Sequence, residues 1–239
     1  LKQYVYDHYT PDKVVISVAG NVTDAFIKQV EELFGQYEGG KARPELEKPS
    51  FHANKLVRKK DTEQSHLCLG YNGYDVGHEN IYSLIILNNV LGGSMSSRLF
   101  QSVREERGLA YSVYSYHTSY QDNGLVVLYG GTGANQVNEL FSTIQSTLDL
   151  ISREGITTKE LENSKEQLKG SLMLSLESTN SRMSRNGKNE LLLGRHRSLD
   201  DIVELIDKAS IDSVNQCIED VFKGPYSAAL IGPQDTWNL

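Results

Sequence analysis

Arg104 and Tyr111 are the residues of this sequence whose types and spacing most invite a chemical role. They stand in the stretch SVREERGLAYSVYSY, residues 102–116, on either side of Gly108. A guanidinium offers several donors in a rigid fork, and a phenol adds a polar tip to an apolar ring. By residue type alone, an arginine on a charged helix is solvated and a tyrosine in a strand bonds a structural partner. A binding role therefore requires a fold that brings the two side chains together.

The histidines do not form a metal-binding motif. Neither H-E-x-x-H nor H-x-x-E-H occurs, and no two histidines stand three or four residues apart around a glutamate. The six histidines are His8, His52, His66, His78, His117 and His196. We therefore predict no metal site in this chain and expect each histidine to be an ordinary surface or core residue.

The two cysteines, Cys68 and Cys217, lie far apart in separate predicted elements. They provide neither a disulfide framework nor the paired spacing of a zinc site. We predict two free, buried thiols, as in a protein of the reducing cytosol.

Two glycine-rich segments could surround a ligand. Residues 91–97, Leu-Gly-Gly-Ser-Met-Ser-Ser, lack the lysine of a P-loop, and Gly131-Thr-Gly133 lacks the third glycine of the dinucleotide fingerprint. The simpler interpretation is that these glycines permit tight turns or close backbone approach. Two functional alternatives stay open: a loop at residues 92–97 that admits an extended peptide beside a cleft, and a nucleotide-binding module at residues 130–135.

Composition excludes several classes of protein. The chain has 239 residues, 38% hydrophobic and 23% charged, with a net charge of −7 and a pI near 5.4. This acidic balance disfavours nucleic-acid binding, which needs clustered lysine and arginine. No segment approaches the roughly 18 consecutive apolar residues of a membrane helix, and the start LKQYVYDHYT does not resemble a signal peptide. We therefore expect a soluble, cytoplasmic protein with no nucleic-acid or membrane partner.

The first part of the chain predicts a helix, a strand and a second helix. Residues 1–9 are helix-like, and residues 13–20 form a β-branched run that ends in glycine. Residues 24–34 place their apolar side chains on one helical face, between a capping Thr23 and Gly35. The segment that follows is rich in glycine, proline and charge, which is typical of a linker.

The rest of the chain predicts a sheet and several helices. Alternating or β-branched runs indicate strands, and periodic apolar runs indicate helices. The predicted elements are strand 64–73, helices 81–93 and 96–108, a hairpin of strands 109–120 and 124–131, helices that begin near residues 137, 157 and 198, and strand 226–232. Thr157 and Glu160 match a capping box. Simple alternation along strand 109–120 puts Tyr111 on one face with Leu109 and Val113, among apolar neighbours.

Strands grouped in hairpins and followed by helices favour an α+β fold, in which a mainly antiparallel sheet has helices packed on one face. The strand at residues 226–232 follows a helix and ends in glycine, as residues 9–20 do, which suggests two copies of one domain type. We divide the chain into residues 1–45, the end of a first domain with the order helix, strand, helix; residues 46–62, a linker; and residues 63–239, a second domain.

The run GGSMSSRLFQSVREERGLAYSVYSYHTSYQDNGLVVLYGGT, residues 92–132, resembles the second half of the pitrilysin/insulinase family of zinc peptidases. Within that family it is most similar to the mitochondrial-processing-peptidase-like branch and its bacterial processing-protease homologues. Residues 1–34, with YTPDKVVISVAGNV, resemble the end of the family's first half, and residues 159–194 resemble the helical region late in its second half. The resemblance implies a LuxS/MPP-like α+β half.

This resemblance implies the C-terminal, substrate-binding half of a zinc metalloendopeptidase that cleaves extended peptides in a closed chamber. In the family the first half carries the zinc ligands, so zinc is expected to bind upstream of Leu1, and this chain alone should be inactive. The arginine and tyrosine of the family fall on Arg104 and Tyr111. Arg104 would grip a substrate carbonyl or carboxylate, and Tyr111 would donate to the oxyanion formed when hydroxide attacks the peptide bond.

Gly92, Gly93 and Ser94 form the substrate-binding loop that this interpretation expects. Its partners would be a peptide substrate, the N-terminal half and a second copy of the protein in a homodimer. The alternative is a non-catalytic partner subunit, because the family also contains members that keep the fold without the zinc motif.

Overall fold

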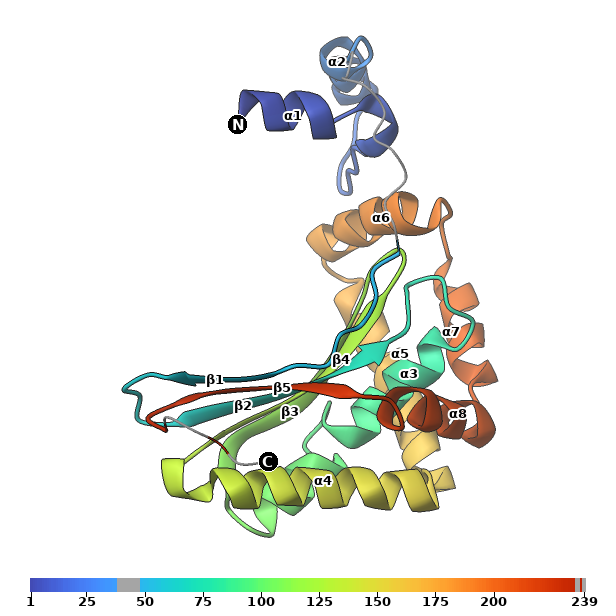
Figure 1. Cartoon of the computed structure of the whole chain (residues 1–239). Coiled ribbons are helices and arrows are strands. Elements are labelled where there is room, and N and C mark those ends of the chain that lie inside the picture. Colours follow the sequence, from blue (N-terminus) through green and yellow to red (C-terminus); the bar gives the residue numbers. More distant parts are fainter. Residues whose placement is uncertain (38–47, 235–236, 238–239) are drawn as a thin grey trace. The chain divides into compact units, whose positions relative to one another are not determined.

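The chain forms two compact units in the computed structural model shown in Figure 1. The residues described are 1–37, 48–234 and 237. By their contacts, residues 1–48 group with residues 170–199 in the first unit, and residues 49–169 group with residues 200–239 in the second. The second unit contains both candidate site residues, Arg104 and Tyr111.

A five-stranded sheet in the order β1-β5-β2-β4-β3 forms the centre of the second unit. β1 and β5 run parallel, and all other neighbours pair antiparallel. The strands are β1 (Lys55–Lys59), β2 (Ser65–Gly73), β3 (Ala110–Ser119), β4 (Gly124–Thr132) and β5 (Tyr226–Gly232). The predicted mainly antiparallel sheet is confirmed, including the hairpin of β3 and β4, whose turn is closed by a 2.8 Å bond from the Tyr120 amide to the Asn123 carbonyl.

β1 lies within the segment predicted to be a linker, so residues 55–59 are a strand of the sheet and not an unstructured connection. Leu56 and Val57 give this charged segment an apolar centre, and pairing with β5 satisfies its backbone. Charged side chains are usual on an edge strand because they oppose pairing with further strands. The rest of the glycine-rich stretch, residues 38–47, lies outside the described residues, and the division into domains stays a prediction.

Helices cover one face of the sheet, as predicted. α4 (Val137–Glu154) runs along the lower side of the sheet in Figure 1, and α3 (Ile81–Leu91) and α8 (Ile211–Phe222) pack on the same side. α4 buries a stripe with helical spacing, made of Val137, Leu140, Ile144, Leu148 and Ile151. Each fully buried aliphatic side chain contributes about 1.5–3 kcal/mol, so this apolar layer holds the sheet and its helices together.

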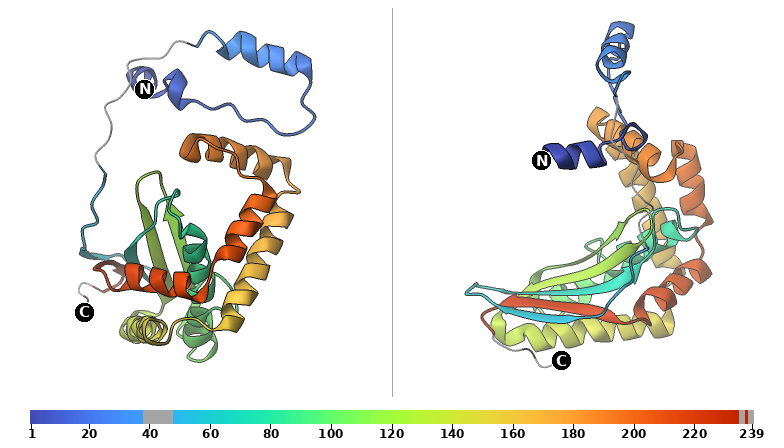
Figure 2. Two further views of the ribbon diagram at one scale, coloured as in Figure 1. Left: turned by 90° about the vertical axis from the view of Figure 1, so that its right-hand side faces the viewer. Right: turned by 45° about the horizontal axis from the view of Figure 1, so that its top comes forward.

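The opposite side of the sheet, which we call the open face, carries the strand residues that alternate away from those helices. Along β2, for example, Leu67 and Leu69 are buried beneath the sheet, whereas His66 and Cys68, which alternate with them, are only half-buried. The right-hand view of Figure 2 looks onto this face, with α4 behind it. The open face comprises Leu56, Arg58, His66, Cys68, Tyr114, Tyr116, Tyr129 and Ile231, together with smaller residues between them.

α5 (Thr158–Ser175) begins with the predicted capping box and is followed by α6 (Thr179–Leu193) and α7 (Leu199–Lys208). The Glu160 amide donates to the Thr157 hydroxyl at 3.2 Å, and the Glu160 carboxylate accepts from the Thr157 amide at 2.7 Å. The same carboxylate receives bonds from Nε of Arg98 at 2.8 Å and from its Nη2 at 2.9 Å. The start of α5 is therefore tied to the segment that leads to Arg104.

We expect Glu160 to make the fold sensitive to acid. Burial, the largest single effect, would raise the pKa of its carboxyl, but the bonds from Arg98 and Thr157 outweigh it and lower the pKa from 4.5 to about 2. Because the pKa is lower in the folded state, the stabilisation is present above pH 4.5 and is lost as the pH falls from there to about 2. Urea unfolding should show the advantage of the wild type over Glu160→Gln shrinking in that window. A difference that stays constant across it would contradict this assignment.

The first unit confirms two predicted helices and corrects one predicted strand. α1 (Lys2–His8) and α2 (Asp24–Phe34) form, and the Thr23 hydroxyl caps α2 by accepting a 3.3 Å bond from the Phe26 amide. The strand predicted at residues 13–20 is wrong: a 3₁₀ turn, η1, occupies Pro11–Lys13, and residues 14–19 join no sheet.

The physical reason is the absence of a neighbouring strand in the described first unit. A β-branched run has a preference for pleated, half-buried surfaces, not an intrinsic strand conformation. This segment contacts a helix instead, since the Ser17 hydroxyl donates to the Met183 carbonyl of α6 at 2.7 Å. In either unit, no helix among the described residues is both long and apolar enough to span a lipid bilayer.

Candidate functional site

Arg104 lies on a π-helical turn, η2 (Phe100–Glu105), between α3 and β3. The bond from the Glu106 amide to the Gln101 carbonyl, five residues back, shows the wider helical ring at 2.9 Å. Gly108 then ends the turn with a φ of 61°, a left-handed conformation that glycine adopts without steric cost. Its amide donates to the Arg104 carbonyl at 3.1 Å. The chain thus reverses at Gly108 and enters β3 next to Arg104.

Arg104 and Tyr111 are in contact. Nη1 of Arg104 donates to the Tyr111 carbonyl at 3.2 Å, and the guanidinium carbon lies 4.3 Å from the centre of the Tyr111 ring. The same carbon lies 4.7 Å from the centre of the Phe100 ring. Cation–π contacts of this kind contribute about 0.5–1 kcal/mol each at exposed sites. Two aromatic rings therefore hold the guanidinium, which keeps further N–H groups for a ligand.

Glu105 is the acidic neighbour of this guanidinium. Its carboxylate lies 3.7 Å from Nε of Arg104, and the two side chains are 53% and 33% exposed. Exposed ion pairs contribute about 0–1 kcal/mol. Glu105 therefore does not remove Arg104 from use by a ligand.

Tyr111 is exposed, and the prediction that it lies among apolar neighbours is wrong. A β-bulge between Ala110 and Ser112 inserts one extra residue into β3, which shifts the alternation of side chains. Beyond the bulge Val113 is buried, whereas Tyr111 is 77% exposed. The Tyr111 hydroxyl has no hydrogen-bond partner among the described residues, so it is available to donate to a ligand.

Gly92 and Gly93 lie at the C-terminal end of α3, where packing requires glycine. A Cβ on Gly92 would stand 2.4 Å from the Ser115 amide nitrogen, and a Cβ on Gly93 would stand 2.9 Å from the Cα of Asn89. The Gly92 carbonyl also accepts a 3.1 Å bond from the Ser115 amide. This part of the loop therefore lies against the outer edge of β3, in the place that an added strand would need.

The glycine loop is separate from the Arg104–Tyr111 contact. Ser115, which the loop meets, stands four residues beyond Tyr111, about 13 Å along the strand, and it is buried on the helix side. Ser94, next in the loop, lines a different cavity of about 310 Å³, together with Asn89 and Asn163. The structure thus brings Arg104 and Tyr111 together and does not bring the loop to them. A substrate-binding role for Gly92, Gly93 and Ser94 stays a prediction.

The second glycine-rich segment begins within β4 and leads towards α4. A Cβ on Gly130 would stand 2.8 Å from a methyl carbon of Leu140. This glycine therefore lets α4 approach the sheet, which is the packing role that its sequence favoured over nucleotide binding.

The described residues do not fit a metal site. Within them, no group of three or more His, Cys, Asp or Glu side chains is placed to hold a metal ion. Cys68 and Cys217 are both free, as predicted; Cys217 is buried and Cys68 is half-buried. Burial raises the pKa of both thiols, that of Cys217 to about 11, so neither is a reactive thiolate at neutral pH.

Sequence reasoning missed an aromatic cluster on the open face. The Tyr114 ring packs on the Tyr129 ring with centres 4.8 Å apart, and the Tyr129 hydroxyl lies 2.7 Å from Nδ1 of His66. The tyrosines at 114 and 116 alternate along one strand, which was a visible signal. Their contact with Tyr129 and His66 depends on the register of three strands, which no local pattern encodes. Phe100, four residues before Arg104, could have been found from its helical spacing.

Comparison with known sequences gives a family match and close relatives. The family model described as Peptidase M16 inactive domain matches residues 1–168. The uncharacterized zinc protease YmxG of Bacillus subtilis (strain 168) is 64% identical over 233 residues, which are 98% of this chain and 57% of that protein. An uncharacterized zinc protease of Streptomyces coelicolor is 36% identical over 242 residues, 98% of this chain and 53% of that protein. The chain spans about half the length of the curated relatives it matches.

Solved structures share the fold. A crystal structure of a peptidase M16 inactive domain from Pseudomonas fluorescens superposes with a TM-score of 0.78 at 21% identity, over 92% of this chain and 53% of that one. A protease from Helicobacter pylori gives a TM-score of 0.77 at 20% identity, over 90% of this chain and 54% of that one. At these identities the likeness concerns the α+β architecture.

Proposed function

Because this chain belongs to the peptidase M16 family, whose inactive domain it matches, we propose that it is the C-terminal, substrate-binding half of a zinc metalloendopeptidase. The resemblance to zinc peptidases read from the sequence is confirmed at the level of the family. The proposed reaction is hydrolysis of extended peptides, carried out by the full-length protein in a closed chamber. The observation that carries the proposal is the contact of Arg104 with Tyr111, which leaves donors of both side chains free.

The two side chains suit different tasks in peptide hydrolysis. The guanidinium of Arg104, held between the Phe100 and Tyr111 rings, can hold a substrate carbonyl or carboxylate before and during the reaction. The hydroxyl of Tyr111 can donate a hydrogen bond to the oxygen that becomes negative as the scissile carbonyl is attacked. Their contact places the two sets of donors next to each other, which favours one orientation of the peptide.

Metal chemistry is proposed to belong to another part of the full-length polypeptide. The described residues offer no group of ligands for zinc, so the contribution of this chain is to bind and orient the peptide. We accordingly expect this chain alone to bind peptides without cleaving them.

Replacing Arg104 with alanine in the full-length protein should weaken peptide binding. A hydrogen bond to a charged group contributes about 1.5–3 kcal/mol. Because the site is exposed, we expect a loss of binding free energy at the lower end of this range, which corresponds to roughly a tenfold rise in KM. Because Arg104 would bind the substrate in both the ground state and the transition state, kcat should change less than KM. Steady-state kinetics with a fluorogenic peptide give both constants.

Arg107→Ala is the matched control, because Arg107 lies two residues beyond the same turn and pairs with Glu106 at 3.4 Å instead of stacking on Tyr111. KM within about twofold of wild type is expected for this variant. An Arg104→Ala protein with unchanged KM and kcat would exclude Arg104 from substrate binding.

The alternative proposal is a non-catalytic partner subunit of a processing-peptidase-like complex. Its basis is the description of the matched family model as an inactive domain. Zinc content and chelator-sensitive peptide cleavage by the purified full-length protein distinguish the two. Bound zinc with cleavage that stops on chelation supports the peptidase, and the absence of both supports the partner subunit.

The assembly and location proposed for the full-length protein are a homodimer in the cytoplasm. The free thiols of Cys68 and Cys217 are compatible with a reducing compartment. Analytical ultracentrifugation of the full-length protein would test the dimer.

A further inference from the structure

The five strands of the sheet contain no acidic residue. Their charged side chains are Lys55, Arg58 and Lys59, all on β1. The whole chain, in contrast, has 31 Asp and Glu residues and a net charge of −7. Among the described residues, the carboxylates therefore lie on helices and connections. The sheet is a region without negative charge in an acidic chain.

One row of residues crosses all five strands on the open face. The strand register aligns Ser112, Gly131, His66, Ile231 and Arg58, in the order β3, β4, β2, β5 and β1. Neighbouring strands lie about 4.8 Å apart, so the row is about 19 Å long, roughly the length of six extended residues. It begins beside Tyr111 and Arg104 and ends at a second arginine, Arg58.

The next row along the strands is aromatic and apolar. It contains Tyr114, Tyr129, Cys68, Ala229 and Leu56. The Tyr129 side chain extends from this row towards the first row, where its hydroxyl oxygen lies 2.7 Å from Nδ1 of His66. A Cβ at position 131 would stand 3.1 Å from that hydroxyl, so Gly131 leaves the room for the contact.

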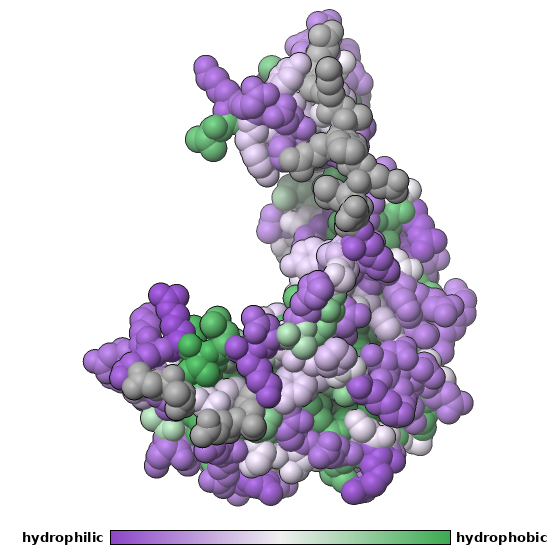
Figure 3. Space-filling model, viewed as in Figure 1, coloured by the Kyte–Doolittle hydropathy of each residue, from purple (hydrophilic) through white to green (hydrophobic). Residues whose placement is uncertain are grey.

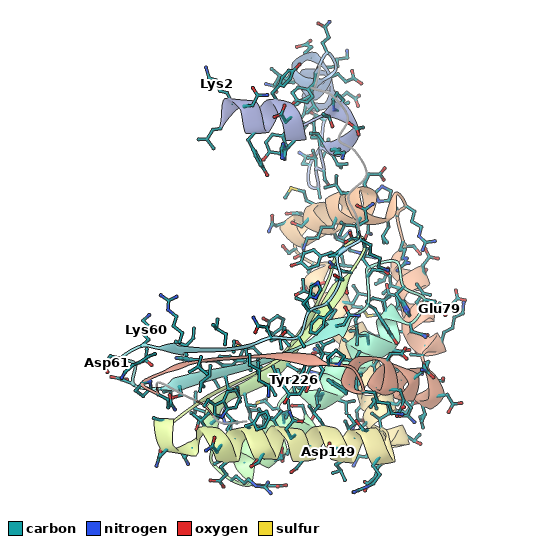
Figure 4. The ribbon with its side chains drawn as sticks, in the orientation of Figure 1. Lys2, Lys60, Asp61, Glu79, Asp149 and Tyr226 are labelled. Atoms are coloured by element: carbon teal, nitrogen blue, oxygen red, sulfur yellow. The ribbon has the colours of Figure 1, made fainter. Side chains whose placement is uncertain are left out.

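Basic and apolar side chains lie together at the β1 end of the open face. Leu56 is 60% exposed, and Ile231 is also exposed. Figure 3 shows a hydrophobic patch on the upper side of the sheet in this region, flanked by hydrophilic side chains. Side chains alternate along β1, so Arg58 lies on the same face as Leu56. The side chain of Lys60, two residues further on, also lies on the side of the sheet away from α4 (Figure 4). Exposed apolar side chains and cationic side chains thus lie next to one another at this end of the face.

We infer that the open face binds an extended peptide segment with aromatic or aliphatic side chains at its centre and a carboxylate side chain near Arg58. This inference rests on the proposed function and adds a substrate preference to it. The tyrosine and leucine side chains favour apolar partners by burial, and Arg58 and Lys60 attract a carboxylate and repel a lysine or arginine. A peptide is the occupant because the row begins at Ser112, the residue that follows Tyr111 in β3, and the scissile bond is proposed to lie at Tyr111.

The test compares two fluorescent peptides with the same central aromatic segment. One carries a glutamate at one end of that segment, and the other carries a lysine at the same position. Binding to the full-length protein is measured by fluorescence anisotropy with a chelator present, so that the result does not depend on cleavage. The wild type should bind the glutamate peptide roughly fivefold more tightly at low salt, and the preference should shrink at high salt. Arg58→Glu should abolish or reverse the preference.

Lys55→Glu is the matched control. It makes the same change in charge on the same strand, but the register pairs Lys55 with the buried Ala228, on the other side of the sheet. Its preference should stay within about twofold of wild type. Equal binding of both peptides to the wild type, or equal effects of Arg58→Glu and Lys55→Glu, would overturn the inference. So would a change of oligomeric state in Arg58→Glu, because it would show that another chain covers the face.

The same experiment separates this inference from the proposed function. Selective binding without any cleavage in the absence of chelator keeps the substrate preference and rejects the peptidase. Cleavage of both peptides without selective binding keeps the peptidase and rejects the preference.

Discussion

Replacing Tyr111 with phenylalanine in the full-length protein should lower kcat for peptide cleavage by about 100-fold to 1,000-fold, the usual loss when one oxyanion donor is removed. The substitution deletes only the hydroxyl. The ring remains to pack against the Arg104 guanidinium, 4.3 Å from its centre, so KM should change little. Since the hydroxyl bonds no described residue and the side chain is 77% exposed, the fold should be unaffected. Steady-state kinetics and circular dichroism measure the two effects.

Tyr120→Phe is the control for this prediction. Tyr120 directly follows β3 and is 53% exposed, but it is distant from Arg104 along the chain. Its kcat should stay within about twofold of wild type. If Tyr111→Phe keeps near-normal kcat, the hydroxyl does not stabilise the oxyanion. If both variants lose activity equally, the loss reflects β3 as a whole and not the Tyr111 hydroxyl.

Replacing Gly92 with alanine should destabilise the second unit by about 3 kcal/mol, the upper end of the usual cost of overpacking. The new methyl group would stand 2.4 Å from the Ser115 amide nitrogen and 2.7 Å from the Ser115 hydroxyl oxygen. The backbone of β3 cannot shift easily at Ser115, because β3 is paired with β4 and Val113, two residues before Ser115, is buried in the core. Urea denaturation of the two proteins gives the difference in free energy of unfolding.

The outcome also decides what the glycine loop does. Ser94→Ala, in the same loop, should change stability by about 0.5 kcal/mol or less, because the Ser94 hydroxyl makes only long bonds, at 3.5 Å to the Asn89 carbonyl and 3.2 Å to Ser96. A Gly92→Ala protein with normal stability and weakened peptide binding would show that the loop binds substrate. Lost stability in Gly92→Ala alone would show that the glycine serves packing.

Most elements of the second unit could be predicted from local patterns. Strands β2 to β5, the helices that follow them and the capping box of Thr157 and Glu160 depend on side chains a few residues apart. Such patterns record which face of an element is buried and where a helix begins. The family resemblance likewise needed only the linear order of residues, and it directed attention to Arg104 and Tyr111.

Elements whose conformation depends on a distant partner could not be predicted in this way. β1 is a charged segment that became a strand because β5, more than 160 residues later, pairs with it. Residues 13–20 have a strand-like composition but meet no strand in the described first unit, so they form none. In both cases the deciding factor is whether a neighbour can satisfy the backbone hydrogen bonds.

The sequence by itself determined the family, the mainly antiparallel α+β fold and the identity of the two candidate site residues, because these follow from local order and periodicity. Only the tertiary structure decided on which side of the sheet Tyr111 lies, because one bulge residue reverses the alternation of every side chain near it. It also decided that Arg104 packs on Tyr111 and that His66 meets Tyr129, because these contacts follow from strand register and from the turn at Gly108.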